Sequence, residues 1–527
     1  MLSAGIITKV LSALFIIPLT RLIGAEGIGL LQMASPIFVA VLVLCASGIP
    51  IAVSKLVSER LAVKDEAGVR QIVLVCLGTM IPIGLLLSYV LYIGADRIAS
   101  FVIKDPRVFF PLRCLSPTIF FVTCSAVLRG YFQGHRIMTL TAVSNITEQI
   151  VKVAIGLGLA YILLPRGVHW SAAGAAAGGT VGSAAGFLVL TICFIMRNQR
   201  KSVSINRGNR RNIPAPSLCA ESFSSTLRQI IVLAAPVTVT TLVWPLQEFL
   251  NAAIIPARLQ YIGFSLSHSV ELYGCLSGMA LGLVTLPCVV TTAMAMNLVP
   301  GVASAYVKKR RHRVIHLAKN AVRGAFLVGT PASIGLLALP TEISLLLFGY
   351  PGAGPLLEIM AFSAVFLCLQ QTTAGILNGV GKVGIPLLNS LIGAACTIVT
   401  VYTLTGIRGL DIRGAAFGIG LGFFVTGALN TIALWKVTGA GFDFFVTGWP
   451  PAVASGVMFP TVKAINGFLL IRTLNTTIST SCAIFAGAVV YGLTLIFLGG
   501  LSLKEISVIP VIGSPLAKVL KFSGLLP

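Results

Sequence analysis

The chain has 527 residues and a formal net charge of +23 at pH 7, with 38 Lys and Arg against 15 Asp and Glu. Only 10% of its residues are charged and 56% are hydrophobic, whereas a typical soluble domain is about 25% charged. This composition excludes a water-soluble multidomain protein. A nucleic-acid partner is also excluded, because long uncharged runs separate the cations that would have to share one polar face.

Uncharged runs dominate the chain, and each exceeds the roughly 20 apolar residues needed to cross a bilayer. The clearest runs are 27–54, 71–95, 167–196, 272–307, 383–407 and 473–503. Apolar residues are continuous within them and do not alternate with polar ones, so the spans are helices and not barrel strands. The sequence therefore predicts an all-α polytopic membrane protein.

Charges, Pro/Gly clusters and polar turns divide the chain into about 14 candidate transmembrane helices. They are 2–23, 29–53, 71–95, 108–131, 138–164, 171–196, 228–256, 272–302, 319–347, 355–380, 384–406, 412–436, 447–470 and 475–500. With the N-terminus inside, the inner connections carry 22 Lys and Arg and the outer ones carry 9. The positive-inside rule then places both termini in the cytoplasm.

The chain offers no sign of a cofactor, a metal site or a catalytic centre. Its 11 cysteines lie singly in apolar stretches, without a C-x-x-C pair or a histidine at ligand spacing, which is typical of core packing. The 5 histidines have no matching acids at useful spacing, and no phosphate-binding loop is present. We therefore expect no cofactor, no metal and no enzymatic activity.

A polar, basic connection near the midpoint divides the chain. The predicted cytoplasmic linker 197–227 separates an N-terminal six-helix lobe, 1–196, from a C-terminal six-helix lobe, 228–436, and 437–527 holds helices 13 and 14 and a cytoplasmic tail. A second basic run, 308–313, is interpreted as an anchor for anionic lipid headgroups.

Three markers recur in the same order in the two lobes. EGIGLLQMA at 26–34 corresponds to ELYGCLSGMA at 271–280, and LRG at 128–130 corresponds to LNG at 377–379. AAGAAAG begins at Ala172, and IRGAAFG begins at Ile412. An even number of spans per lobe makes such repeats parallel. Two parallel lobes around a central cavity form the architecture of a carrier.

Extended motifs carry a family resemblance over most of the chain. They are ITKVL at 7–11, PLTRLIGAEGIGL at 18–30, QMA at 32–34, GIP at 48–50, VSK at 53–55, IPARLQ at 255–260, LYG at 272–274, GMA at 278–280 and LVP at 298–300. The chain resembles the stage V sporulation protein B group of polysaccharide and lipid-linked oligosaccharide exporters. The resemblance implies the fold of the multidrug/oligosaccharidyl-lipid/polysaccharide (MOP) superfamily. It further implies flipping of an undecaprenyl-linked, lipid II-like precursor across a bacterial inner membrane, in cell wall or spore cortex formation.

A lipid-linked sugar carries an anionic diphosphate, so cations must project into its path. Lys9 and Arg21 lie near one face of the first span, about 18 Å apart along its axis. They either attract phosphate or snorkel at the helix ends. Gln32, Asn145 and Asn378 are candidates for sugar contacts, although interhelical hydrogen bonding is the default use of such residues.

Several charged and polar residues are candidates for gating or for binding a coupling ion. They are Glu26, Glu148, Lys152, Glu248, Asn251, Arg258 and Glu271. Glu148 and Lys152 are spaced i,i+4, which favours an ion pair with a structural or a gating role. Glu248 has no intrahelical cation, so it is protonated, paired with another helix or part of a coupling-ion site.

Two other functions remain open at this stage. An ion-coupled multidrug or small-molecule exporter of the same superfamily would prefer an acidic, aromatic-lined cavity, whereas the first lobe offers cations. A sporulation factor that acts in assembly without transport is the other alternative.

Overall fold

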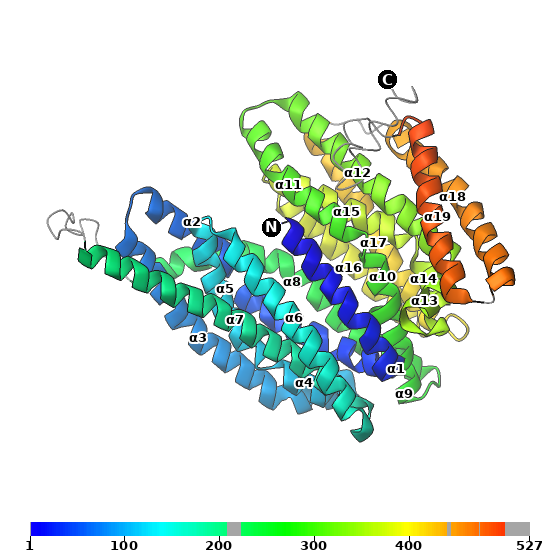
Figure 1. Cartoon of the computed structure of the whole chain (residues 1–527), viewed down its shortest axis with the longest axis horizontal. Helices are drawn as coiled ribbons and strands as arrows, with labels where there is room; N and C mark the ends of the chain where they lie inside the picture. The colour runs from blue at the N-terminus through cyan, green and yellow to red at the C-terminus, as the bar shows by residue number, and fades with distance from the viewer. Residues whose placement is uncertain (1, 208–222, 440–443, 474, 501–527) are drawn as a thin grey trace. The chain divides into compact units, whose positions relative to one another are not determined.

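A computed structural model describes residues 2–207, 223–439, 444–473 and 475–500. Every regular element in these ranges is a helix, as Figure 1 shows. The chain divides into two compact units, Met1–Gly274 and Cys275–Pro527, which we call unit 1 and unit 2. The prediction of an all-α polytopic membrane protein is confirmed.

The described part of unit 1 contains nine α-helices. They are α1 (Leu2–Ala46), α2 (Ile49–Ala62), α3 (Glu66–Arg97), α4 (Phe109–Leu115), α5 (Thr118–Gly134), α6 (Met138–Leu163), α7 (Val168–Arg207), α8 (Phe223–Tyr261) and α9 (Leu266–Tyr273). Short helical turns lie at Ile98–Ile103, Pro106–Val108 and Leu164–Arg166. The π-helical segment Gly274–Ala280 follows α9 in the chain.

Ten α-helices lie in the described part of unit 2. They are α10 (Leu281–Thr285), α11 (Cys288–Val307), α12 (Arg311–Ala338), α13 (Pro340–Phe348), α14 (Gly354–Met360), α15 (Ser363–Gly379), α16 (Gly384–Leu404), α17 (Asp411–Thr438), α18 (Phe444–Thr473) and α19 (Thr476–Phe497). A short turn, Pro351–Ala353, precedes α14. Helices α16 and α17 pack as a pair, as do α18 and α19.

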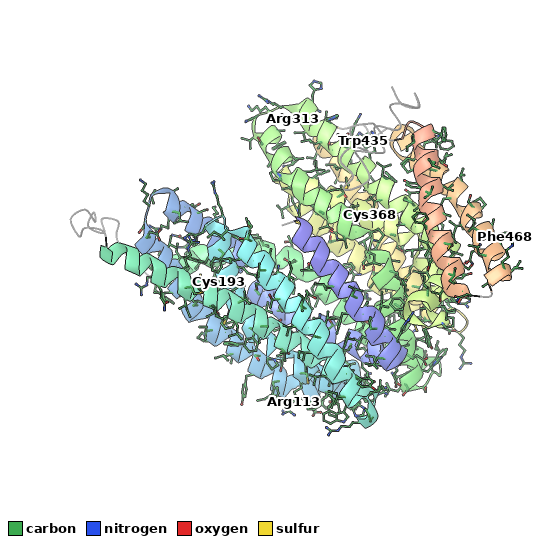
Figure 2. All side chains as sticks on the ribbon, viewed as in Figure 1. Arg113, Cys193, Arg313, Cys368, Trp435 and Phe468 are labelled. Atoms are coloured by element: carbon green, nitrogen blue, oxygen red, sulfur yellow. The ribbon has the colours of Figure 1, made fainter. Side chains whose placement is uncertain are left out.

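Large apolar side chains cover much of the outside of the helices. The exposed fraction is 53% for Trp435 on α17 and 56% for Phe468 on α18, and both are marked in Figure 2. Extensive exposed apolar surface is unfavourable in water, but it suits helices that face lipid tails.

Twelve helices in the described ranges are long and apolar enough to span a membrane, or up to 13 if the bent pair Pro351–Met360 and Ser363–Gly379 forms one span. The predicted count of 14 is therefore not confirmed. One reason is that the predicted span 2–23 and most of the predicted span 29–53 lie in the single helical element α1, and the structure has one candidate span over Leu14–Ala62. No loop separates the two predicted spans, because the helix is interrupted at a single residue, Gly24.

Gly24 interrupts α1 with φ 70° and ψ −178°, a conformation that is essentially restricted to glycine. An added Cβ would find nothing within 4 Å, so only the backbone would be strained. We expect Gly24→Ala to lower the free energy of unfolding by roughly 1–2 kcal/mol, measured by thermal unfolding in detergent. Gly78→Ala on α3 also meets open space but has ordinary helical backbone, so this control should not destabilise. Equal stability of the two variants would contradict the prediction.

Helices α8 and α9 belong to unit 1, where they pack against α1; α8 also contacts α2 and α3. The sequence predicted that the second lobe begins at 228, so the compact unit and the predicted repeat have different boundaries. Of the predicted linker 197–227, the first part continues α7 to Arg207 and the last part begins α8, while 208–222 lie outside the described residues. The predicted tail beyond residue 500 also lies outside the described residues.

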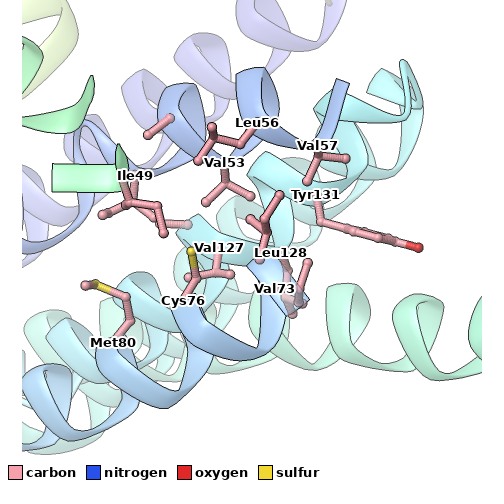
Figure 3. Close-up of a cluster of buried hydrophobic side chains, with 14 of the residues drawn as sticks. Ile49, Val53, Leu56, Val57, Val73, Cys76, Met80, Val127, Leu128 and Tyr131 are labelled. Atoms are coloured by element: carbon pink, nitrogen blue, oxygen red, sulfur yellow. The ribbon is translucent and has the colours of Figure 1, made fainter. Parts of the chain in front are cut away.

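The main apolar core of unit 1 lies between α2, α3 and α5 (Figure 3). Val53 and Val57 of α2 face Gly130 and Gly134 of α5, where an added Cβ would lie 2.7 Å from a valine side-chain atom. The two glycines, four residues apart, therefore allow α2 to approach the backbone of α5. This packing fixes the rotation of α5 and with it the direction of Arg129.

Candidate functional site

A stripe of polar residues runs along α6 within the span Met138–Arg166. Asn145, Glu148, Gln149 and Lys152 are spaced i, i+3, i+4 and i+7, which places them on one face of a helix. Four polar side chains on one face of a membrane helix need partners on neighbouring helices. Helices α1, α5 and α7 supply contacts to this stripe.

Helix α7 approaches α6 through glycines. A Cβ added at Gly178 would overlap the Cα of Gly156 on α6, and one at Gly182 would lie 2.6 Å from the carbonyl oxygen of Glu148. The backbones therefore lie nearly in contact, as Figure 1 shows for the neighbouring ribbons of α6 and α7. This approach brings Ser183 of α7 to the carboxylate of Glu148.

Glu148 uses both carboxylate oxygens. Arg129 of α5 donates from Nη2 to Oε2 at 2.8 Å, and the Ser183 hydroxyl donates to Oε1 at 2.8 Å. The two ionic side chains are only 22% and 19% exposed. Lys152, the predicted partner on the same helix, has no carboxylate oxygen within 4.0 Å among the described residues, although Glu148 acts on it electrostatically. A partner on another helix outcompetes the one on the same helix.

Lys152 lies against α1 instead. Its Nζ atom is 5.3 Å from the centroid of the Phe15 ring, and one turn earlier the Ser12 hydroxyl donates to Gln149 Oε1 at 3.3 Å. The later residue of α1 lies beside the later residue of α6, so the two helices run in the same direction. The stripe therefore lies between the first helix and the α7 glycines.

The site has an excess of positive charge and of unused polar atoms. Arg129 and Lys152 supply two cations against the single carboxylate of Glu148. Arg129 Nε and Asn145 Oδ1 are buried and have no hydrogen-bond partner in the described structure. A buried polar atom without a partner is costly. The Arg129 Nε donor and the surplus cation favour a ligand with negative charge, whereas the Asn145 Oδ1 acceptor needs a donor such as a hydroxyl group.

The predicted headgroup residues have different outcomes. Asn145 belongs to the stripe. Arg21 is exposed on α1, Gln32 is half-buried beyond the Gly24 break, and Asn378 is exposed on α15 of unit 2. Lys9 lies in α1, but its side chain is outside the described residues. Their roles in binding stay predictions.

Sequence reasoning missed Arg129, Ser183, Ser12 and Gln149. Arg129 was assigned to the connection after the fourth span, whereas it lies within α5, five residues before its end. Its isolation in the apolar stretch 121–132 was the available signal. The other three are small or neutral residues that acquire a role only through contacts between helices.

A second ionic network joins three elements of unit 1. Arg107 donates to both oxygens of the fully buried Asp105, from Nη2 at 2.9 Å and from Nε at 3.0 Å. It also binds Glu26 of α1 and donates to Ser267 of α9 at 3.2 Å. Glu26, a predicted gating residue, is thus tied to α9 just beyond the break at Gly24.

The predicted residues Arg258 and Glu271 are both near the end of unit 1. The Arg258 guanidinium lies 4.8 Å from the centroid of the Tyr261 ring, and Glu271 is 3.0 Å from His268 Nδ1. A gating role for either residue stays a prediction.

Glu248 of α8 is buried, with an 8% exposed fraction. Its closest described polar partner is Asn251, whose Nδ2 lies 3.5 Å from Glu248 Oε1. Asn251 is 1% exposed and its Oδ1 has no hydrogen-bond partner in the described structure. No described residue forms an ion pair with Glu248. This acid is separate from the α6 stripe.

Comparison with known proteins identifies the family. A family model described as "Polysaccharide biosynthesis protein" matches residues 1–264, half of the chain. The chain belongs to the polysaccharide biosynthesis protein family. A second model, MatE, matches residues 276–403 of this family member. The first match lies within unit 1 and the second within unit 2.

Two relatives of this family member come from Bacillus subtilis (strain 168). Stage V sporulation protein B is 27% identical over 515 residues, which is 97% of each chain. Lipid II flippase MurJ is 24% identical over 489 residues, covering 88% of this chain and 86% of the relative. The resemblance inferred from the opening motifs is confirmed.

Solved structures show the same fold. An inward-facing multidrug resistance MATE family transporter of the MOP superfamily matches with a TM-score of 0.65 and 14% identity, over 84% of this chain and 95% of that chain. Lipid II flippase MurJ in its inward closed conformation matches with a TM-score of 0.64 and 14% identity, over 93% and 96%. The predicted MOP superfamily fold is therefore confirmed.

Proposed function

We propose that this protein moves an undecaprenyl-linked cell-wall or polysaccharide precursor, similar to lipid II, between the leaflets of a bacterial inner membrane by alternating access. Both termini lie in the cytoplasm in this proposal, and no covalent chemistry takes place. The names of the two relatives, a sporulation protein and a lipid II flippase, support a role in cell wall or spore cortex formation.

The observation that carries the proposal is the excess positive charge of the α6 stripe. A cation placed in the middle of a membrane helix costs about 2.5–3.5 kcal/mol on insertion scales, so a second cation beside one carboxylate is retained against a penalty. A diphosphate headgroup would supply the missing negative charge while its polyprenyl chain stays among the lipid tails.

The basic run 308–313 supports contacts with anionic membrane lipids. All six residues of this run, which extends from the end of α11 into the first turn of α12, are exposed, and Arg313 is marked in Figure 2. A cluster of cations at a helix–helix turn attracts the anionic inner leaflet. We infer that this turn lies on the cytoplasmic side.

Glu248 favours a second candidate function, an ion-coupled exporter of small molecules. A buried carboxylate with an amide as its described neighbour can take up a proton or a monovalent cation. The same acid would couple an ion gradient to movement of the lipid-linked precursor if the first function holds.

The decisive test is transport in reconstituted vesicles. Purified protein in liposomes should move fluorescent lipid II, or another undecaprenyl-diphosphate sugar, faster than protein-free liposomes, measured by protection of the dye from a membrane-impermeant quencher. A natively folded protein that moves none of these lipids contradicts the proposal. Export of cationic dyes driven by a sodium or proton gradient would then support the second candidate, and inactivity in both assays would support an assembly role.

A further inference from the structure

Lys152 is the cation of the α6 stripe that has no carboxylate oxygen within 4.0 Å among the described residues, and the acid that acts on it electrostatically is Glu148. Both oxygens of Glu148 are bound by Arg129 and Ser183. The carboxylate has about four acceptor sites and also acts electrostatically on Lys152, but its single negative charge can balance only one of the two cations. The Arg129–Glu148 pair is neutral as a unit, and the charge of Lys152 is the surplus.

The packing of α6 keeps this arrangement in place. Gly182 of α7 would clash with Glu148 and Lys152 if it carried a side chain, since a Cβ there would lie 3.0 Å from Lys152 Cβ. The narrow gap between α6 and α7 cannot hold the long lysine side chain. The ammonium group accordingly extends to the α1 side, near Phe15.

The contact with Phe15 does not replace a counterion. At 5.3 Å from the ring centroid, the ammonium is near the outer limit of a cation–π contact, which is weaker than the cost of holding a charge inside the membrane. An ammonium group carries three donors and no acceptor. Lys152 keeps part of its surface exposed.

We propose that Lys152 is a direct ligand of one phosphate of the transported lipid diphosphate, with Arg129 and Glu148 acting as a fixed neutral support beside it. This inference rests on the proposed function and adds a named phosphate subsite on α6. Asn145, two turns earlier on the same face, lies on the path along which the rest of the headgroup would extend. A phosphate oxygen would accept hydrogen bonds from Nζ.

Binding to three probes tests the subsite in the detergent-solubilised full chain. Undecaprenyl diphosphate, undecaprenol and inorganic pyrophosphate are titrated by native mass spectrometry against wild type, Lys152→Met and Lys152→Arg. The methionine preserves length without charge, and the arginine preserves charge. We expect Lys152→Met to bind undecaprenyl diphosphate roughly 10–100-fold more weakly, Lys152→Arg to bind it nearly as wild type does, and undecaprenol binding to be unchanged in both.

Lys463→Met is the matched control. Lys463 is also a lysine within a membrane-spanning helix, α18, and its Nζ lies 4.7 Å from the centroid of the Phe459 ring. Its replacement should leave binding of undecaprenyl diphosphate unchanged. An equal loss in Lys463→Met would show a general charge effect and would overturn the assignment to Lys152.

Labelling of the wild-type chain covers the case in which Lys152→Met does not fold. Undecaprenyl diphosphate should slow acetylation of Lys152 at least about fivefold, as resolved by peptide mass spectrometry, whereas undecaprenol should not. Protection by pyrophosphate as well would show that the subsite recognises free diphosphate, and protection by the lipid alone would show that it needs the polyprenyl chain. Either supports the subsite, and protection by neither overturns it.

The two proposals fail in different ways. If wild-type protein moves the lipid in vesicles and Lys152→Met moves it equally well, the subsite is wrong and the proposed function stands. If wild type neither binds nor moves any lipid diphosphate, the proposed function is wrong and the subsite falls with it.

Discussion

Replacing Glu148 by Leu is expected to lower the free energy of unfolding by about 3 kcal/mol. The change removes the carboxylate partner of Arg129 and raises the surplus positive charge of the α6 stripe from one to two. Removing one partner of a buried ion pair typically costs about 3–5 kcal/mol. The lower value applies because both partners keep about a fifth of their surface exposed. Thermal or urea unfolding in detergent measures the difference.

Arg129→Met is the informative companion. It should lower the free energy of unfolding by less than Glu148→Leu does. Glu148 can then turn to Lys152, four residues away on the same helix. The double variant Arg129→Met/Glu148→Leu should recover part of the loss, since it removes both members of the pair and leaves the apolar groups to pack. A Glu148→Leu variant as stable as wild type, or a double variant that shows simple additivity, would contradict the assigned pairing.

Gly178→Ala is expected to destabilise the protein by about 2–3 kcal/mol, as overpacking in a filled interior does. Its new methyl group would overlap the backbone of Gly156, where no side chain can move aside. The helices α6 and α7 must then separate, which also lengthens the Ser183–Glu148 hydrogen bond. The loss should appear as a lower midpoint of thermal unfolding in detergent.

Gly158→Ala is the control for this packing. Gly158 lies on α6 two residues after Gly156, and a Cβ there would meet nothing within 4 Å. Alanine favours the helix over glycine by roughly 0.5–1 kcal/mol, so this variant should be as stable as wild type or more so. Similar destabilisation by both substitutions would show that helix contact at Gly178 is not the cause.

Much of the architecture followed from the distribution of charge and apolar residues along the chain. Uncharged runs that are long enough to cross a bilayer predict membrane helices even when no contact between helices is known. The motifs near Gly24 and Glu26 were sufficient to indicate the family. The span count was less predictable, because a helix break made by a single glycine leaves no polar loop in the sequence.

The α6 stripe shows which features follow from spacing along the sequence and which depend on contacts between helices. The sequence by itself determined that Asn145, Glu148 and Lys152 share a helix face, since helical periodicity depends only on spacing. Only the tertiary structure decided that Glu148 binds Arg129 and not Lys152, and that Glu26 binds Arg107, 81 residues away. Ion pairs depend on which helices touch and in what rotation, and here glycine contacts such as Gly178 on Gly156 set that approach. Spacing along one chain carries no information about it.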